Sequence, residues 1–164
     1  MLKGIPTRIS SDLLKALADM GHGDLLIIAD DFYPPITKTP GGVSIQAKGN
    51  SAADMIEDIL KLMPLDVDYC EHPVEYMVPD QDAGVSMDRP KVWDDAVEAV
   101  VRNGYAPKMW DDAIEAVVRN GYAPKIVGEI ERSKFYEKAG RAYVTVCTSE
   151  RQPYGCFILQ KGVM

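Results

Sequence analysis

The residue best suited to acid–base chemistry is His22, which stands in the glycine-rich segment Gly21-His22-Gly23-Asp24 shortly before Asp30. Glycine on both sides gives the backbone unusual freedom and lets a ligand approach the main chain. A predicted helix ends just before this segment, and the partial negative charge of a helix C-terminus favours a protonated imidazole. Such a histidine can act as a general acid near neutral pH. The simpler interpretation makes Gly21 a helix terminator and His22 a surface residue.

Two further groups carry polar side chains near apolar ones. Arg132 and Tyr136 are four residues apart, so in a helix that begins near Ser133 they point to the same side and can bind hydroxyl groups. The alternative is a surface arginine and a tyrosine packed by its ring. The third group, Pro153-Tyr154-Gly155-Cys156, is a turn before an apolar strand and by itself indicates only a hairpin.

Strand and helix patterns alternate along the chain that must position these residues. Ser10 or Ser11 can cap a helix with Leu13, Leu14, Leu17 and Met20 at helical spacing, and a second helix follows Ser51 and stops at Pro64. The continuous apolar run 25–29 predicts a strand buried on both faces. The remaining predicted elements are strands at 43–47, 74–78, 125–131, 142–148 and 156–160 and a helix at 133–139 capped by Ser133. This order predicts a three-layer α/β/α domain with a mostly parallel or mixed central sheet. Segments 33–42 and 80–90 have loop composition, and the second is expected to be the most mobile.

A tandem duplication interrupts this pattern. Residues 92–108 and 109–125 are adjacent 17-residue copies that differ only at their first and sixth positions. Each copy predicts a short helix that Asn-Gly ends. Two copies of this length do not make a repeat fold. We therefore expect a single domain over residues 1–164, with the duplication in a helical surface region and with Trp93 and Trp110 as helix-packing residues.

Composition excludes several classes of protein. The chain has 164 residues, 46% of them apolar, which is enough for one core. A net charge of -7 argues against a nucleic-acid partner. The sequence shows no long apolar run and no secretory signal, so we expect no membrane association and a cytoplasmic location. The three cysteines and two histidines lack metal-site spacing, so no metal is expected.

At these clusters the sequence resembles the L-fucose mutarotase and D-ribose pyranase family. The resemblance rests on LLKALADMGHGD with Asp30, on IERSKFYEKAGRAY and on TSERQPYGCFILQKGV, and it covers nearly the whole chain outside the second repeat copy. The G-H-G-D form and the R-x-x-F-Y-E-[RK]-A stretch are closest to the L-fucose mutarotase branch. The resemblance implies an α/β/α fold, no cofactor, and interconversion of the α and β anomers of a free monosaccharide.

The resemblance also implies roles for individual residues. His22 matches the family's proton donor, and Tyr136 is our candidate for a catalytic proton relay, with Tyr154 as the alternative. The substrate-binding positions are Asp30, Asp66, Arg132, Tyr154 and Cys156. Cys156 stands where the family's Y-[GA]-N signature has asparagine, and a thiol is a weak donor that cannot supply both functions of an amide.

Mutarotation needs one proton delivered to the ring oxygen and another removed from the anomeric hydroxyl. We expect His22 to be the acid and Asp30 with Arg132 to hold the hydroxyl groups. His22 and Asp30 flank a five-residue strand, however, so their backbones lie roughly 20 Å or more apart if it stays extended. Either the segment bends or a neighbouring subunit completes the site. We expect a shared site, and the family resemblance implies ring-like homo-oligomers.

Two other functions fit the same residues. The chain can be a pyranase that acts on ribose or another pentose. It can also be a non-catalytic sugar-binding protein that kept the fold after losing the signature asparagine.

Overall fold

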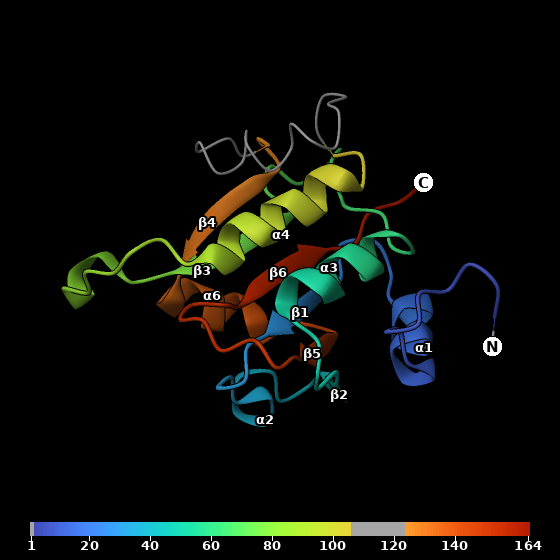
Figure 1. The fold of residues 1–164 in the computed structure, drawn as a ribbon, viewed down its shortest axis with the longest axis horizontal. Helices are drawn as coiled ribbons and strands as arrows, with labels where there is room; N and C mark the ends of the chain where they lie inside the picture. Colours follow the sequence, from blue (N-terminus) through green and yellow to red (C-terminus); the bar gives the residue numbers. More distant parts are fainter. Residues whose placement is uncertain (1, 106–123) are drawn as a thin grey trace.

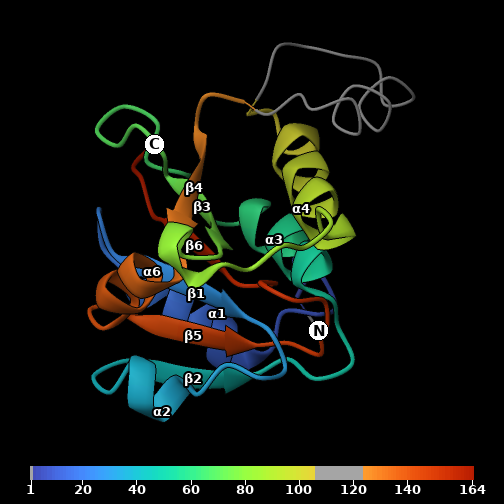
Figure 2. The ribbon, with the colours of Figure 1, turned by 90° about the vertical axis from the view of Figure 1, so that its left-hand side faces the viewer.

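A computed structural model describes residues 2–105 and 124–164, which form one mixed sheet with helices on both faces (Figures 1 and 2). The helix expected in the second repeat copy falls outside the described residues. Of that copy, only the last two residues, 124 and 125, are described. Within the described ranges, no helix has the length and apolar character needed to cross a bilayer.

The sheet has six strands in the order β2-β5-β1-β6-β3-β4. β6 is antiparallel to both of its neighbours, β1 and β3, and the other three pairs are parallel. The strands are β1 (Leu25–Ala29), β2 (Val43–Gln46), β3 (Val74–Val78), β4 (Val127–Glu131), β5 (Val144–Cys147) and β6 (Phe157–Gln160). All six lie within the predicted segments, and the sheet is mixed.

β1 lies inside the sheet and is buried on both faces, as its unbroken apolar sequence predicts. Leu26 and Ile28 pack into the larger apolar cluster, on the face that carries α1 (Ser11–Asp19), α3 (Ala52–Leu60) and α4 (Lys91–Arg102). Leu25, Ile27 and Ala29 pack into the second cluster, which includes residues of α6 (Arg132–Ala139) on the other face. Figure 2 shows α6 and α4 on opposite sides of the strands, which confirms the three-layer α/β/α architecture.

The N-terminal starts of the first two long helices follow from local sequence. The Ser10 hydroxyl accepts a hydrogen bond from the Leu13 amide at 3.2 Å, and the Ser51 hydroxyl accepts one from the Asp54 amide at 3.1 Å. Each serine satisfies a helical N–H that has no partner inside its helix. α3 ends at Leu60, before the proline that was expected to stop it.

Three local expectations were wrong. α6 begins at Arg132, and the Asp80 carboxylate, not the Ser133 side chain, accepts the hydrogen bond from the Ser133 amide at 2.9 Å. The segment 33–42 contains a short helix, α2 (Pro35–Lys38), and segment 80–90 contains a 3-10 turn at Gln81–Ala83. Asp80 caps a helix more than fifty residues away, a pairing that no local pattern reveals.

The first repeat copy is part of the core. It supplies most of α4, which packs against α3 and is followed by the C-cap residue Asn103 and by Gly104, whose φ is +90°. Its buried residues are Val92, Trp93, Ala96, Val97, Glu98, Ala99, Val100 and Val101. The expectation of a surface position therefore fails for this copy.

Candidate functional site

Five of the seven predicted site residues meet at one edge of the sheet. Asp30 follows the carboxyl end of β1, Arg132 follows that of β4, and Cys156 precedes the antiparallel β6, so all three reach the same edge. Tyr136 comes from α6 and Tyr154 from the β5–β6 connection. With Phe32, Tyr33 and Met77, these residues line a cavity of about 170 Å³, here called the carboxyl-edge pocket. Open α/β sheets bind ligands at this edge.

Asp30 and Cys156 are hydrogen-bonded neighbours in the lining of the pocket. The Asp30 amide donates to Cys156 Sγ at 3.4 Å, and Asp30 Oδ1 accepts a hydrogen bond from the Phe32 amide at 3.0 Å. Burial raises the pKa of the Asp30 carboxyl, which brings it closer to neutral pH. Burial also raises the pKa of the Cys156 thiol, so the sulfur stays protonated and uncharged.

Tyr136 is held by its ring. The ring lies 6.0 Å from that of Tyr33 and 6.2 Å from that of Phe135, measured between centroids, and Lys38 Nζ is 4.3 Å from its centroid. Burial raises the pKa of the Tyr136 phenol. Its hydroxyl therefore keeps its proton at neutral pH and can donate a hydrogen bond to a ligand.

Arg132 is oriented by Asp80, which sequence reasoning missed. Arg132 Nε lies 3.3 Å from Asp80 Oδ2, while Asp80 Oδ1 accepts from the Ser133 amide. The hydrogen bond from Ser133, and then that from Arg132, lower the pKa of Asp80. The Asp80 carboxylate, which is ionised at neutral pH, thus binds the guanidinium of Arg132, a residue that lines the pocket.

His22 and Asp66 lie at the opposite edge of the sheet, before the amino end of β1. His22 Nε2 is 3.1 Å from Asp66 Oδ2, which also accepts a hydrogen bond from Gln160 Nε2 at 2.9 Å. The histidine side chain is 41% exposed and the aspartate side chain 3%. The histidine ring lies 5.1 Å from that of Tyr69. The structure therefore does not bring the two predicted catalytic residues, His22 and Tyr136, together within one chain.

Lys161 contacts both the loop that carries His22 and the C-terminus of α1. Lys161 Nζ donates to the carbonyls of Leu17 and Met20 at 2.8 and 2.6 Å, so its ammonium neutralises the C-terminus of α1. Gly23, with a φ of +83°, donates from its amide to the Lys161 carbonyl at 2.8 Å. His22 thus contacts the buried Asp66 carboxylate, whereas the carbonyls at the end of α1 are paired with Lys161.

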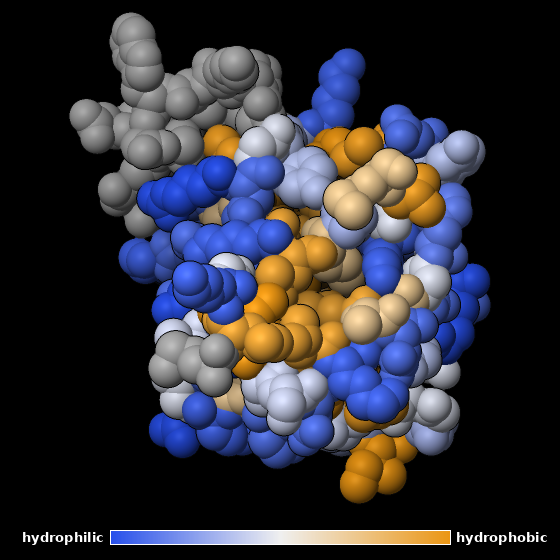
Figure 3. Space-filling model, turned by 90° about the vertical axis from the view of Figure 1, so that its right-hand side faces the viewer, coloured by the Kyte–Doolittle hydropathy of each residue, from blue (hydrophilic) through white to orange (hydrophobic). Residues whose placement is uncertain are grey.

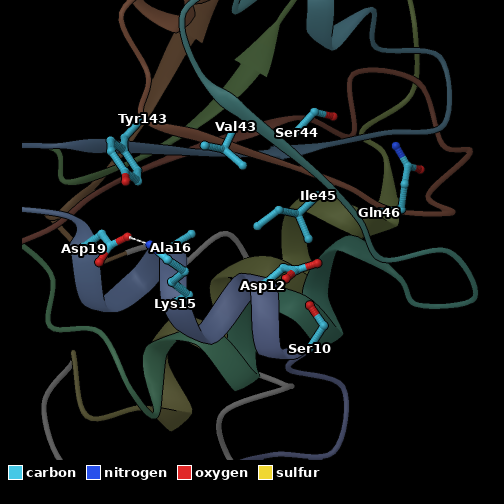
Figure 4. A pocket seen from close by; sticks show the side chains of 10 residues that line it. All are labelled: Ser10, Asp12, Lys15, Ala16, Asp19, Val43, Ser44, Ile45, Gln46 and Tyr143. Carbon is cyan, nitrogen blue, oxygen red and sulfur yellow. Dashed lines mark hydrogen bonds and ion pairs between the residues drawn. The ribbon is translucent and has the colours of Figure 1, made fainter.

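A larger hollow lies elsewhere and contains none of the predicted site residues. It has a volume of about 500 Å³ and lies between α1 and the edge strand β2. Figure 4 shows side chains from these two elements and Tyr143 around it, with Lys15 in an ion pair with Asp19. The carboxyl-edge pocket is therefore distinguished by the residues that line it and not by its volume.

The sheet has helices on both faces, and an acid, an arginine and two tyrosines lie at its carboxyl edge. This arrangement is typical of proteins that bind a small polar ligand. The profile of the RbsD / FucU transport protein family matches residues 3–164. The chain belongs to this family.

Relatives and solved structures agree with this assignment. The chain is 35% identical to the fucose mutarotase of Homo sapiens, over 99% of this chain and 94% of the human protein. It is 37% identical to the L-fucose mutarotase of Actinobacillus pleuropneumoniae serotype 5b (strain L20), over 99% and 97% of the two chains. The fucose mutarotase of Streptococcus pneumoniae in complex with L-fucose superposes with a TM-score of 0.78 at 32% identity, covering 99% of both chains. RbsD of Bacillus subtilis complexed with D-ribose, at 20% identity and a TM-score of 0.58, covers 100% of this chain and 99% of its own and shares the fold.

Proposed function

We propose that this chain is a mutarotase that interconverts the α and β anomers of L-fucose. The observation that carries the proposal is the convergence of Asp30, Arg132, Tyr136 and Tyr154 on one small pocket. Its volume of about 170 Å³ lies below the roughly 300–1,000 Å³ of sites for drug-sized ligands. A polar pocket of this size suits a single sugar ring. The relatives named fucose mutarotase, and the S. pneumoniae structure with L-fucose, support the same substrate.

Each group in the pocket has a distinct part in holding the sugar. The Asp30 carboxylate accepts hydrogen bonds from sugar hydroxyls, and the Arg132 guanidinium donates them. The phenols of Tyr136 and Tyr154 donate to hydroxyl or ring oxygens. Cys156 offers a small uncharged wall, and we assign it a contact without a strong hydrogen bond.

The reaction is an acid–base cycle without net consumption of protons. Protonated His22 donates its proton to the ring oxygen while the bond from that oxygen to the anomeric carbon breaks. The phenolic oxygen of Tyr136, or of Tyr154, takes up the proton of the anomeric hydroxyl while the phenol passes its own proton to solvent, and the aldehyde forms. Rotation about the bond between the first two carbons presents the other face, the ring closes, and both protons return. General acids and bases each contribute roughly 10²–10⁴-fold to such steps.

We propose that the complete site is shared between two copies of this chain. His22 and the carboxyl-edge pocket lie at opposite ends of β1, so one monosaccharide cannot contact both within one chain. Exposed aromatic side chains flank both parts, namely Phe32 beside the pocket, 72% exposed, and Tyr69 beside His22, 75% exposed. We propose that these two side chains contact the partner copy.

The N-terminal segment offers further apolar surface for assembly. Together with the start of α1 it lines a groove of about 340 Å³, which includes Leu2, Ile5 and Leu14. Figure 3 shows the face of the molecule that carries α1 and the N-terminal segment, with an apolar area at its centre. We also propose a cytoplasmic location, which the free thiols Cys70, Cys147 and Cys156 support.

NMR exchange spectroscopy of free sugars tests the function directly. We expect the chain to accelerate exchange between the anomers of L-fucose. Acceleration with D-ribose but not with L-fucose would instead establish a pyranase. Binding of L-fucose without faster exchange would establish a sugar-binding protein that has lost catalysis.

A further inference from the structure

The β5–β6 connection presents Tyr154 in an unfavourable backbone conformation. Its φ is +56°, and no other residue with a side chain has a positive φ within residues 2–105 and 124–164. Residues with a Cβ hold this conformation only where surrounding contacts impose it. Tyr154 also lines the carboxyl-edge pocket, so those contacts decide where its phenol lies.

The start of α4 supplies the contacts. The indole Nε1 of Trp93 donates a hydrogen bond to the Tyr154 carbonyl at 3.0 Å. One residue earlier, the Val92 amide donates to Gln152 Oε1 at 2.9 Å. The Val92 amide belongs to the first turn of the helix, where N–H groups have no helical acceptor. α4 therefore holds the connection on both sides of residue 153.

Trp93 is itself fixed in place. Its ring lies 4.8 Å from that of Tyr76, centroid to centroid, and the Arg89 guanidinium carbon is 5.4 Å from the indole centroid. Arg89 Nε is bound in turn to Asp94 Oδ1 at 2.8 Å. Because the indole is also buried, it cannot turn away from the Tyr154 carbonyl without breaking this stack.

We propose that Trp93 is a positioning residue for Tyr154. Its indole N–H fixes the Tyr154 carbonyl, and this keeps the phenol directed into the carboxyl-edge pocket. The inference rests on the function proposed above for that pocket. It gives the first repeat copy a role in the geometry of the site, in addition to its packing against α3.

Replacing the donor alone is the sharpest test, and the chain makes it practicable. It contains two tryptophans, Trp93 and Trp110, in nearly identical sequence contexts. In a Trp110→Phe background, biosynthetic incorporation of β-(3-benzothienyl)alanine in place of tryptophan changes position 93 only. This analogue keeps the bicyclic shape and lacks the N–H. Trp93→Phe is the simpler second variant, and Trp110→Phe alone is the matched control.

We expect the analogue to lower kcat/KM for L-fucose anomer exchange about five- to tenfold, the usual effect of losing one hydrogen bond. The loss should vanish in a Tyr154→Phe background, because Trp93 acts through Tyr154. Trp110→Phe should match the wild type. An unchanged kcat/KM, or the same loss in both backgrounds, would overturn the proposal, since a merely structural role affects both backgrounds equally.

A second readout does not depend on activity. The ¹³C shift of the Tyr154 carbonyl reports its hydrogen bond, and it should move in the analogue and in Trp93→Phe but not in Trp110→Phe. An unmoved carbonyl signal would contradict the inference. If the wild type failed to accelerate the exchange of any sugar, the proposed function would fall, and this signal would still decide the role of Trp93.

Discussion

The two ends of β1 carry different chemistry. At its carboxyl end, Asp30 joins an arginine and two tyrosines around a pocket, which is an arrangement for holding hydroxyl groups. At its amino end, an exposed His22 contacts the buried carboxylate of Asp66, and this is the group that we propose as the proton donor. The proposed mechanism thus divides ligand binding and proton transfer between opposite edges of one sheet. Under that proposal, a second copy of the chain brings the two parts to one sugar.

Removal of His22 should separate the two functions and have the largest effect. We expect His22→Ala to slow anomer exchange of L-fucose by at least about 10²-fold, because the general acid is lost. Binding of the sugar, measured by calorimetry, should change only a few-fold, because the pocket at the other edge stays intact. His72→Ala is the matched control, since this second histidine lies 2.9 Å from the Lys125 carbonyl through its Nδ1 and does not line the carboxyl-edge pocket. Undiminished exchange in His22→Ala would remove His22 from the mechanism.

Mixing two inactive variants tests whether the two parts meet between chains. His22→Ala lacks the proton donor and Arg132→Met lacks a pocket cation, so neither should be active alone. After subunit exchange, random assembly gives sites with both parts intact, and about a quarter of the wild-type rate should return. Two copies of the same variant, mixed in the same way, should recover nothing. A mixture that stays inactive, although the chains have exchanged, would show that the site is not shared.

Sequence patterns predicted the helices and strands better than the contacts between them. The apolar run 25–29, the caps Ser10 and Ser51 and the alternation of strands and helices are local signals, and each was confirmed. The length of a strand also indicated that His22 and Asp30 would stand at its opposite ends. Strand order then explains why the predicted pocket residues converge, because the carboxyl ends of parallel strands share one edge.

The contacts that sequence reasoning missed all join distant segments. Asp80 binds Arg132, Trp93 binds the Tyr154 carbonyl, and Lys161 binds the end of α1. In each case the partners are brought together only by the packing of separate elements, so no spacing in the sequence reveals them. Segment 80–90 was expected to be merely the most mobile loop, yet it supplies Asp80, which binds Arg132, and Arg89, whose guanidinium lies over the Trp93 indole.

A substitution at Cys156 can strengthen sugar binding in the carboxyl-edge pocket and leave His22 unchanged. Cys156→Asn replaces a weak donor by an amide that both donates and accepts. We expect affinity for L-fucose to rise about fivefold, the value of roughly one hydrogen bond. Titration calorimetry measures this, and Cys70→Asn serves as a control at a cysteine outside the pocket. Weaker binding in Cys156→Asn would show that the thiol fits its surroundings better than an amide does.

Adjacent aspartates at the carboxyl end of β1 should affect stability with opposite signs. Burial raises the pKa of Asp30, so its ionised form disfavours the folded state, and Asp30→Asn should raise the thermal unfolding midpoint at neutral pH. Lys48, and then Arg151, lower the pKa of Asp31, which stabilises the fold above its unfolded pKa, so Asp31→Asn should lower the midpoint. The Asp30 difference should fade as the pH falls from roughly 8 through the raised pKa of Asp30 to the unfolded value of about 3.9. The Asp31 difference should persist to that pH and fade only below it, as the pH falls through the lowered pKa of Asp31. Thermal unfolding across this range measures them, and shifts of equal sign would contradict the assignment.

The smallest effects concern the duplication, which should leave both ends of β1 intact. Deleting 92–108 or 109–125 gives two chains that differ only in carrying Met109 and Ile114, or Val92 and Val97, at two positions. Both keep one tryptophan in the context Pro-Lys-x-Trp, so anomer exchange should stay within about twofold of the wild type. Val92 and Val97 are each 1% exposed, and larger side chains in such positions cost about 1 kcal/mol or more. Denaturant unfolding should therefore find the chain without 92–108 the less stable of the two, whereas equal stability would mean that the packing around α4 accommodates either copy.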